Sequence, residues 1–456
     1  MAETGITREL ARFIVQTKPQ DLPLYAIKKA KDCFLDWLGC AFIGSRSESA
    51  RMFLELVQEQ GGNRESTIIG HEMTSCLNAA LVNGAISHEM EFDDVHKASI
   101  SHPGAAVIPA ALAIAEREHA SGMTFLASIV LGYDVATRIG EAVGPSHYKY
   151  WHTTGTCGTF GAAAAAGKVL ELDRDGMLNA LGNAGTQAAG LWEFITDGAM
   201  TKVLHPAKAA TNGLLSALLA KKGFTGATKI LEGERGFCKA SSSEYDLQRI
   251  IRGLGKDYKI LEVSFKPYPC CRHTHSTIKA ALDLIREHAL DYPDVRSVRV
   301  EIYSTAIEIA GILQPKTPRE AKFSLPYCLA VALKCQKVGL DEFVYSRLED
   351  EGIRKLMNKV QLTVNPALDA AYPGMWPTII EIETKQGQLL RKRVDFPPGD
   401  PENPLAKGEL KDKFRQLAGS VIKERNIESI IEMIERLEMV RDMSKLTEAL
   451  REASAE

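Results

Sequence analysis

The sequence lacks several features that mark common classes of protein. Among its 456 residues, no apolar run reaches the roughly 18 residues that a membrane span needs. The opening residues, MAETGITREL, lack the basic and apolar regions of a secretory signal peptide. The formal net charge of −3 gives none of the basic excess that nucleic-acid-binding proteins carry. We therefore expect no nucleic-acid partner and no membrane partner.

Cysteine pairs of the kind that bind structural zinc are also lacking. The nine cysteines are scattered, only Cys270 and Cys271 are adjacent, and no CxxC pair occurs. An odd cysteine count without a secretory signal is typical of a reducing compartment. The sequence therefore predicts a cytoplasmic protein without a structural zinc site. Cys33 and Cys40, which fall in an apolar helical pattern, are expected to fill the core.

The sequence does have helical periodicity over most of its first ~265 residues. After Pro23, apolar residues such as Ile27, Phe34 and Ala41 recur at three- or four-residue steps, with lysines on the other face. The same period predicts an apolar helix over 105–116 and another over 124–144. A length of 456 residues allows two or three domains, and the share of predicted helix is well above the usual value.

The pattern changes near Lys266. The segment VRSVRVEIYS alternates apolar and polar residues, which indicates a half-buried strand, and TIIEIETKQGQLLRKRVDF predicts a hairpin that turns at Gln386 and Gly387. FSLPYCLAVALKCQ, between them, is expected to be a helix. We predict a mostly α-helical main domain (1–268 with 400–456) and a smaller α+β lid domain (269–399). The C-terminal helices are expected to pack back on the main domain.

One short segment, Ser87 to Gly104, is rich in acid and base side chains. It contains His88, Glu89, Glu91, Asp93, Asp94, His96 and His102. Three interpretations are open: solvated charges at a helix end, a metal site, or general acid–base catalysis. His96 and His102 are six positions apart across a turn, which disfavours the metal site. His102 directly precedes a predicted buried helix, which can hold its ring in place.

A further candidate segment begins at His152 and continues as a Gly/Thr-rich stretch into a polyalanine helix. We expect the stretch to be a loop. The spacing of Gly155, Gly158 and Gly161 resembles a phosphate-binding loop, but no strand precedes it. Tight helix packing is therefore the better interpretation of these glycines.

Two other segments supply cations. MTKVLHPAKAATNG contains Lys202, His205 and Lys208, which could be exposed charges at the start of a helix. FKPYPCCRHTH, from Phe265 to His275, has two prolines that fix its backbone, and its cations suit the binding of a di- or tricarboxylate. They are Lys266, Arg272, His273 and His275. An arginine can bind a carboxylate through two parallel hydrogen bonds.

These motifs together resemble a known family. EFDDVH followed by HPGAAVIPA resembles the signature of the 2-methylcitrate dehydratase family, also written MmgE/PrpD, which includes cis-aconitate decarboxylase and iminodisuccinate epimerase. Matching segments run in the family's order from about residue 33 to 415, and they include EAKFS and PGDPENPLAKGELKDKF. The DFDDT of cis-aconitate decarboxylase is EFDDV in this chain, which argues against the decarboxylase activity but does not identify methylcitrate over another acid.

The resemblance implies a homodimer with a helical main domain and a lid, and a cofactor-independent lyase acting on a small polycarboxylate. It favours a hydro-lyase of the 2-methylcitrate dehydratase type. The catalytic candidates are His102, His152, Lys202, Lys266 and Asp93. The substrate-binding candidates are Glu91, Arg272 and His275. We expect His102, His152, Lys202 and Lys266 to meet in one cleft.

Other functions remain open. Within the family, a decarboxylase or an epimerase needs much the same stabilisation of a carbanion. Outside it, the chain could be a metal-dependent hydrolase that uses the EFDDVH cluster, or a protein that binds carboxylates without turnover.

Overall fold

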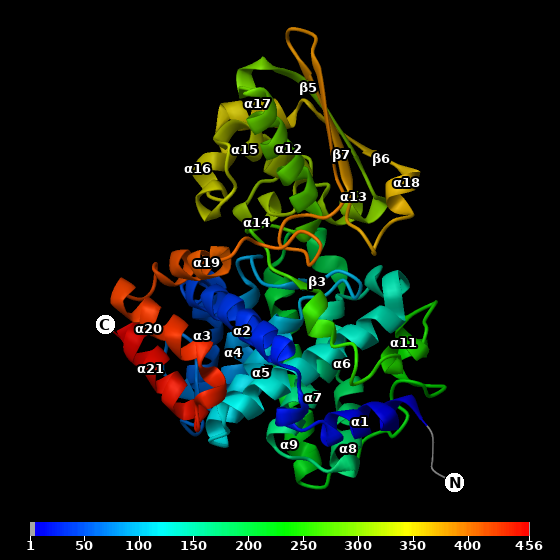
Figure 1. Ribbon diagram of the computed structural model, residues 1–456, viewed down its shortest axis with the longest axis vertical. Coiled ribbons are helices and arrows are strands. Elements are labelled where there is room, and N and C mark those ends of the chain that lie inside the picture. The colour runs from blue at the N-terminus through cyan, green and yellow to red at the C-terminus, as the bar shows by residue number, and fades with distance from the viewer. Residues whose placement is uncertain (1–4, 456) are drawn as a thin grey trace. The chain divides into compact units, whose positions relative to one another are not determined.

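The computed structural model describes residues 5–455 and divides into two compact units. The first unit comprises Met1–Val263 and Ala406–Glu456, and the second comprises Ser264–Leu405 (Figure 1). Within the described residues, no helix has the length and apolar character of a membrane span.

The first unit is built from helices, as the periodicity predicts. The longer helices before the second unit are α1 (Ile6–Gln16), α2 (Leu24–Gly44), α3 (Glu48–Gln60), α4 (Cys76–His88), α5 (Pro103–Arg117), α6 (Gly122–Tyr148), α7 (Thr153–Val169), α8 (Arg174–Gly185) and α9 (Leu204–Lys221). The shorter elements are β1 (Ser66–Thr67), β2 (Met73–Thr74), β3 (Val95–His96), η2 (Trp192–Ile195), η3 (Met200–Val203), α10 (Phe237–Ser241), α11 (Gln248–Ile251) and η4 (Lys259–Glu262).

Small residues let the central helices approach closely. Helix α7 packs against α5, α6 and α9. A Cβ atom added to Gly158 would lie 2.7 Å from the Cβ of Ala106, and one added to Gly161 would lie 2.6 Å from the carbonyl oxygen of Gly132. The prediction of tight packing is therefore confirmed. The expected loop after His152 was wrong, because helix α7 already begins at Thr153 and includes the glycines.

The C-terminal segment returns to this helical unit. It forms α19 (Glu409–Ala418), α20 (Glu424–Glu435) and α21 (Met443–Ala455). Helix α19 packs on α2, and α21 packs on α5 (Figure 1). A Cβ atom on Gly39 of α2 would lie only 3.3 Å from the ring of Phe414, so the absence of a side chain there lets α19 lie close.

The second unit contains a four-stranded mixed sheet with helices. The strands β5 (Val295–Ile302), β6 (Val360–Val364), β7 (Thr378–Thr384) and β8 (Leu389–Val394) are ordered β6-β5-β7-β8. Strands β5 and β6 run parallel, and the other pairs are antiparallel. The hairpin between β7 and β8 turns through Gly387, whose φ is +82°. The predicted combination of a helical domain and an α+β domain is thus confirmed.

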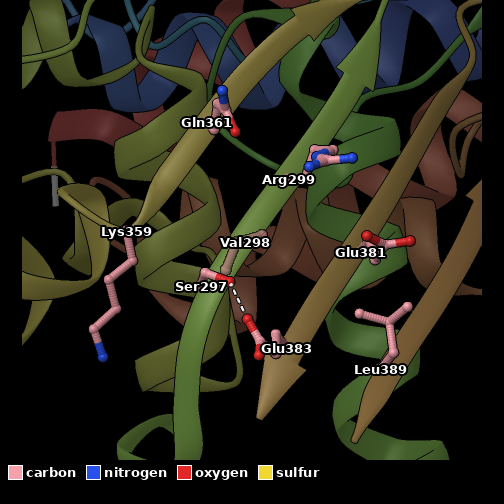
Figure 2. A pocket seen from close by; sticks show the side chains of 8 residues that line it. All are labelled: Ser297, Val298, Arg299, Lys359, Gln361, Glu381, Glu383 and Leu389. Atoms are coloured by element: carbon pink, nitrogen blue, oxygen red, sulfur yellow. Dashed lines mark hydrogen bonds between the residues drawn. The ribbon is translucent and has the colours of Figure 1, made fainter. Parts of the chain in front are cut away.

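Helices cover one face of this sheet. Helix α12 (His275–His288) packs on β7 and β8, and α15 (Leu325–Cys335) packs on α12. The opposite face carries polar side chains around a hollow that includes Arg299, Gln361 and Glu381, as Figure 2 shows. Ser297 donates a 3.1 Å hydrogen bond to Glu383 there. Helix α12 begins at His275, directly after the turn Arg272–Thr274.

Candidate active site

Three helix ends in the first unit bring histidines together. His88 is the last residue of α4, His102 precedes α5, and His152 precedes α7. The ring centroids of His88 and His102 are 4.8 Å apart, those of His88 and His152 are 5.8 Å apart, and those of His102 and His152 are 6.3 Å apart. All three side chains are buried or nearly so. We call His88, His102 and His152 the histidine cluster.

Asp93 orients two rings of the histidine cluster. The Nδ1 atom of His88 lies 2.7 Å from Oδ2 of Asp93, and Nδ1 of His102 lies 3.3 Å from the same oxygen. His102 Nδ1 also donates to the backbone carbonyl of Asp94 at 2.8 Å. A carbonyl can only accept, so Nδ1 of His102 carries a proton and Nε2 of the neutral ring has the lone pair. In a neutral His102 ring, Nε2 is therefore the accepting nitrogen.

The ring of His152 is buried beside His205 and Trp192. Its Nδ1 atom lies 3.1 Å from Nδ1 of His205, and its ring contacts that of Trp192 with centroids 4.8 Å apart. Burial, and then the nearby charges of His205 and Lys202, hold the pKa of His152 well below its usual value. Burial also lowers the pKa of His205 to about 4. Both rings are therefore neutral near pH 7.

Lys202 forms a buried ion pair with Glu91. Lys202 lies in the turn η3, just before α9, and Glu91 lies between α4 and β3. Glu91 has a φ of +55°, a left-handed conformation that is uncommon for a residue other than glycine. Such conformations persist where the surrounding structure enforces them, and they often occur at functional sites.

The carboxylate of the neighbouring Asp94 contacts helices α5 and α6. Its carboxylate accepts hydrogen bonds from the hydroxyl of Tyr133 at 2.7 Å and from the backbone N–H of Gly104 at 3.1 Å. Burial raises the pKa of Asp94 to about 7, although these two hydrogen bonds lower it. Asp94 therefore anchors the first turn of α5 to the segment before it.

His96 also turns away from the histidine cluster. Its Nε2 atom lies 3.4 Å from Glu262 and 3.8 Å from Glu141, and Lys259 bridges the same two carboxylates. The pKa of Glu262 falls to about 2: burial opposes the shift, but His96 and Lys259 outweigh it. The EFDDVH segment thus serves two separate environments, and its acids and histidines do not form one metal centre.

Two groups in the described part of the chain have the ligand types and spacing that a metal ion would need. They are His88, His102 and His152, and His96, Glu141 and Glu262. In the second group the ammonium of Lys259 already lies 2.9 Å from Glu141, where a cation would bind. In the first group, each ring has its Nδ1 atom engaged, so its Nε2 atom is the candidate ligand.

The remaining candidates lie in the second unit. Lys266 is fully buried. Arg272 is also buried: it pairs with Asp400 and donates to the carbonyl of Pro398 at 2.9 Å. His275 accepts from Arg272 through Nδ1 at 3.0 Å, and its Nε2 atom lies 3.1 Å from the carbonyl of Cys270. The prediction that Lys266 shares a cleft with His102, His152 and Lys202 stays a prediction.

Two members of this environment were not among the candidates selected from the sequence. The sequence pattern assigns no role to His88, and it allows His205 to be an exposed charge at the start of a helix. Both are buried beside the candidates, His88 through Asp93 and His205 through His152. The signal for His88 was its place at the end of the small-residue helix α4, three positions ahead of Glu91.

Comparison with known proteins identifies the family. The N-terminal domain of the MmgE/PrpD family matches residues 8–250, and its C-terminal domain matches residues 268–439. The chain therefore belongs to the MmgE/PrpD family, whose enzymes are lyases that act on small carboxylates.

Several individual proteins are similar to this chain over nearly their whole length. A cis-aconitate decarboxylase-like protein of Aspergillus oryzae is 28% identical over an alignment of 475 positions, which covers 97% of this chain and 97% of its own. The cis-aconitate decarboxylase of Aspergillus terreus is 28% identical, covering 98% of this chain and 96% of its own. The human cis-aconitate decarboxylase is also 28% identical, covering 98% and 95%.

Proposed function

We propose that the protein is a cofactor-independent lyase for a small di- or tricarboxylate, and that cis-aconitate decarboxylation is the first activity to test. The observation that carries the proposal is the histidine cluster: the rings of His88 and His102 are oriented by one carboxylate, Asp93, with the buried pair of Lys202 and Glu91 nearby. Buried groups with perturbed pKa values and fixed directions are typical of acid–base sites.

In this proposal each residue of the site has a separate role in the reaction. Loss of CO₂ or of a proton next to a carboxylate leaves a carbanion, which must be stabilised and then protonated. His102 supplies Nε2 as the proton-transfer atom, and Asp93 fixes its ring. Lys202 supplies positive charge for a carboxylate of the substrate, and His152 assists as another neutral ring. Lys266, Arg272 and His275 remain candidates for binding the other carboxylates.

The choice of reaction rests on the relatives. The three proteins described above are named as cis-aconitate decarboxylases or as similar to one. Their similarity to this chain covers at least 95% of their own length. At 28% identity, this supports the reaction type more strongly than the substrate. Dehydration of a 2-methylcitrate-like acid is the second candidate, because Glu91 and Val95 replace the first and last residues of the DFDDT motif.

A panel of tri- and dicarboxylates, followed by proton NMR, tests the proposal. We expect turnover of cis-aconitate with release of CO₂, at a rate that is unchanged after treatment with a chelator. Appearance of an alkene from 2-methylcitrate instead would select the second candidate. Activity that is lost on chelation and restored by a metal would contradict the cofactor-independent mechanism and would make the histidine cluster the first candidate for the metal site.

A further inference from the structure

A lysine of the C-terminal segment contacts the backbone of the candidate site. Lys413, on helix α19, donates a 2.6 Å hydrogen bond from Nζ to the carbonyl of Phe92, and it pairs with Asp36 of α2 at 2.7 Å. Its ammonium also lies 4.2 Å from the ring centroid of Phe92. The Lys413 and Asp36 side chains are 7% and 0% exposed, so this contact is shielded from water.

The residue that Lys413 holds lies between two site residues. Glu91, which precedes Phe92, pairs with Lys202, and Asp93, which follows it, orients His88 and His102. This part of the chain has no regular secondary structure, and Glu91 adopts a φ of +55°. A buried carbonyl outside a helix or sheet needs a donor from elsewhere. Lys413 supplies that donor to Phe92.

We propose that Lys413 is a positioning residue, which fixes the Glu91–Asp93 backbone so that the Lys202 pair and the histidine cluster keep their geometry. The C-terminal segment thereby acts in the site although it lies more than three hundred positions further along the chain. Its link to catalysis rests on the proposed function. Because a displacement of about 1 Å at a catalytic group can cost about 10²-fold in rate, we expect a loss of that order in kcat without this bond.

A purely structural role must be separated from this one. Replacing Lys413 alone leaves the Asp36 carboxylate buried opposite an uncharged side chain, which by itself destabilises the fold. The double variant Asp36→Asn/Lys413→Met removes both charges and should recover most of the melting temperature. It still lacks the donor to Phe92. In the double variant we therefore expect the stability to recover while the geometry of the site stays disturbed.

The experiment compares the wild type, Lys413→Met, Asp36→Asn/Lys413→Met and the control Lys411→Met. Lys411 lies on the same helix and forms an ion pair with Glu435 at the surface. For each protein we would measure the melting temperature, steady-state kinetics on cis-aconitate, and amide hydrogen exchange in peptides covering 88–104 without substrate. The exchange readout does not depend on the substrate, so it tests the positioning even if the proposed function fails.

The expected result is faster exchange in 88–104 and a kcat lowered about 10²-fold in both Lys413 variants, including the double variant with recovered stability. Lys411→Met should match the wild type in every measurement. Wild-type exchange in 88–104 in the double variant would overturn the proposal, as would faster exchange spread evenly over the first unit. If the wild type turns over no carboxylate while the exchange result holds, the proposed function fails and the positioning of the segment by Lys413 stands.

Discussion

The histidine cluster in the first unit can be compared with residues 265–275 of the second unit, which we call the Arg272 segment. The two differ in how their side chains are engaged. Both contain buried histidine side chains. In the histidine cluster, the Nδ1 atom of each ring lies within hydrogen-bonding distance of a protein partner, which sets the direction of the ring. In the Arg272 segment, the guanidinium is engaged by Asp400 and by backbone carbonyls. We infer that the partners of each side chain, rather than the density of charge in the sequence, separate candidate reactive groups from structural ones.

The largest effect is expected for His102→Gln. Glutamine keeps a polar side chain but cannot transfer a proton, so kcat should fall by about 10²–10⁴-fold while KM changes much less. His119→Gln is the matched control, because His119 is a largely exposed histidine paired with Asp442. Steady-state kinetics on both variants give the result. A kcat close to wild type for His102→Gln would remove this residue from the mechanism.

Arg272→Lys tests whether Arg272 binds the substrate or stabilises the fold. The sequence predicts a substrate clamp, whose loss of two parallel hydrogen bonds would cost about 1.5–3 kcal/mol and raise KM roughly ten- to a hundred-fold. The structural partners of Arg272 predict that a similar free energy is lost from folding instead. Denaturant unfolding and KM, measured on the same variant, decide between the two.

A raised KM with unchanged unfolding free energy would restore Arg272 as a clamp. A lowered unfolding free energy with unchanged KM would make it structural. A fall in kcat alone would contradict both assignments.

The dependence of stability on pH should show opposite contributions within the first unit. The pKa of His205 is about 4, below its usual value of 6.5, so the folded state binds fewer protons than the unfolded state between these values. Its contribution to stability is therefore lost as the pH falls from 6.5 to 4. The pKa of Asp94, raised to about 7, acts in the opposite direction: its contribution is lost as the pH rises from about 4 to 7.

Each contribution should be on the order of 1–3 kcal/mol. Asp94→Asn should steepen the loss of stability on acidification, and His205→Asn should flatten it. Urea unfolding at pH 7, 6 and 5 measures both slopes. Equal slopes in the two variants would show that the pKa values of Asp94 and His205 are not shifted in opposite directions.

The smallest effect is expected on the polar face of the sheet in the second unit (Figure 2). Arg299 lines the hollow there, and its side chain is exposed, unlike those of the two buried segments. Arg299→Gln should therefore change the unfolding free energy by no more than about 0.5 kcal/mol. Turnover should stay at the wild-type rate. A clear loss of turnover would identify the hollow as part of a functional surface and would contradict the proposal that activity depends on the buried clusters alone.

Periodicity predicted most of the fold because each helix or strand buries one face. The hairpin around Gly387 and the apolar helix after His102 follow directly from such local patterns. The first turns of α7 were missed because glycine and threonine favour loops as single residues. In this chain they serve close helix packing instead. Local propensity cannot register a neighbour that lies many residues away.

The candidate site was predictable only in part, because its contacts join distant segments. His96 and His102 are close in sequence, but the backbone hydrogen bonds between His96 and Ser101 reverse the chain, and His96 faces Glu141 and Glu262. Conversely, His205 meets His152 from 53 positions away. Hydrogen-bond partners of this kind decide which nitrogen of a histidine reacts, and a sequence pattern does not contain them.

The histidine cluster is proposed to transfer a proton to or from a small carboxylate. Incubating the wild type and His102→Gln with cis-aconitate in deuterated water, followed by proton NMR, tests it most directly. We predict that the wild type forms a product carrying solvent deuterium at the carbon that was protonated, and that His102→Gln forms it at least about 10²-fold more slowly. Turnover without deuterium incorporation, or equal rates for the two proteins, would contradict it.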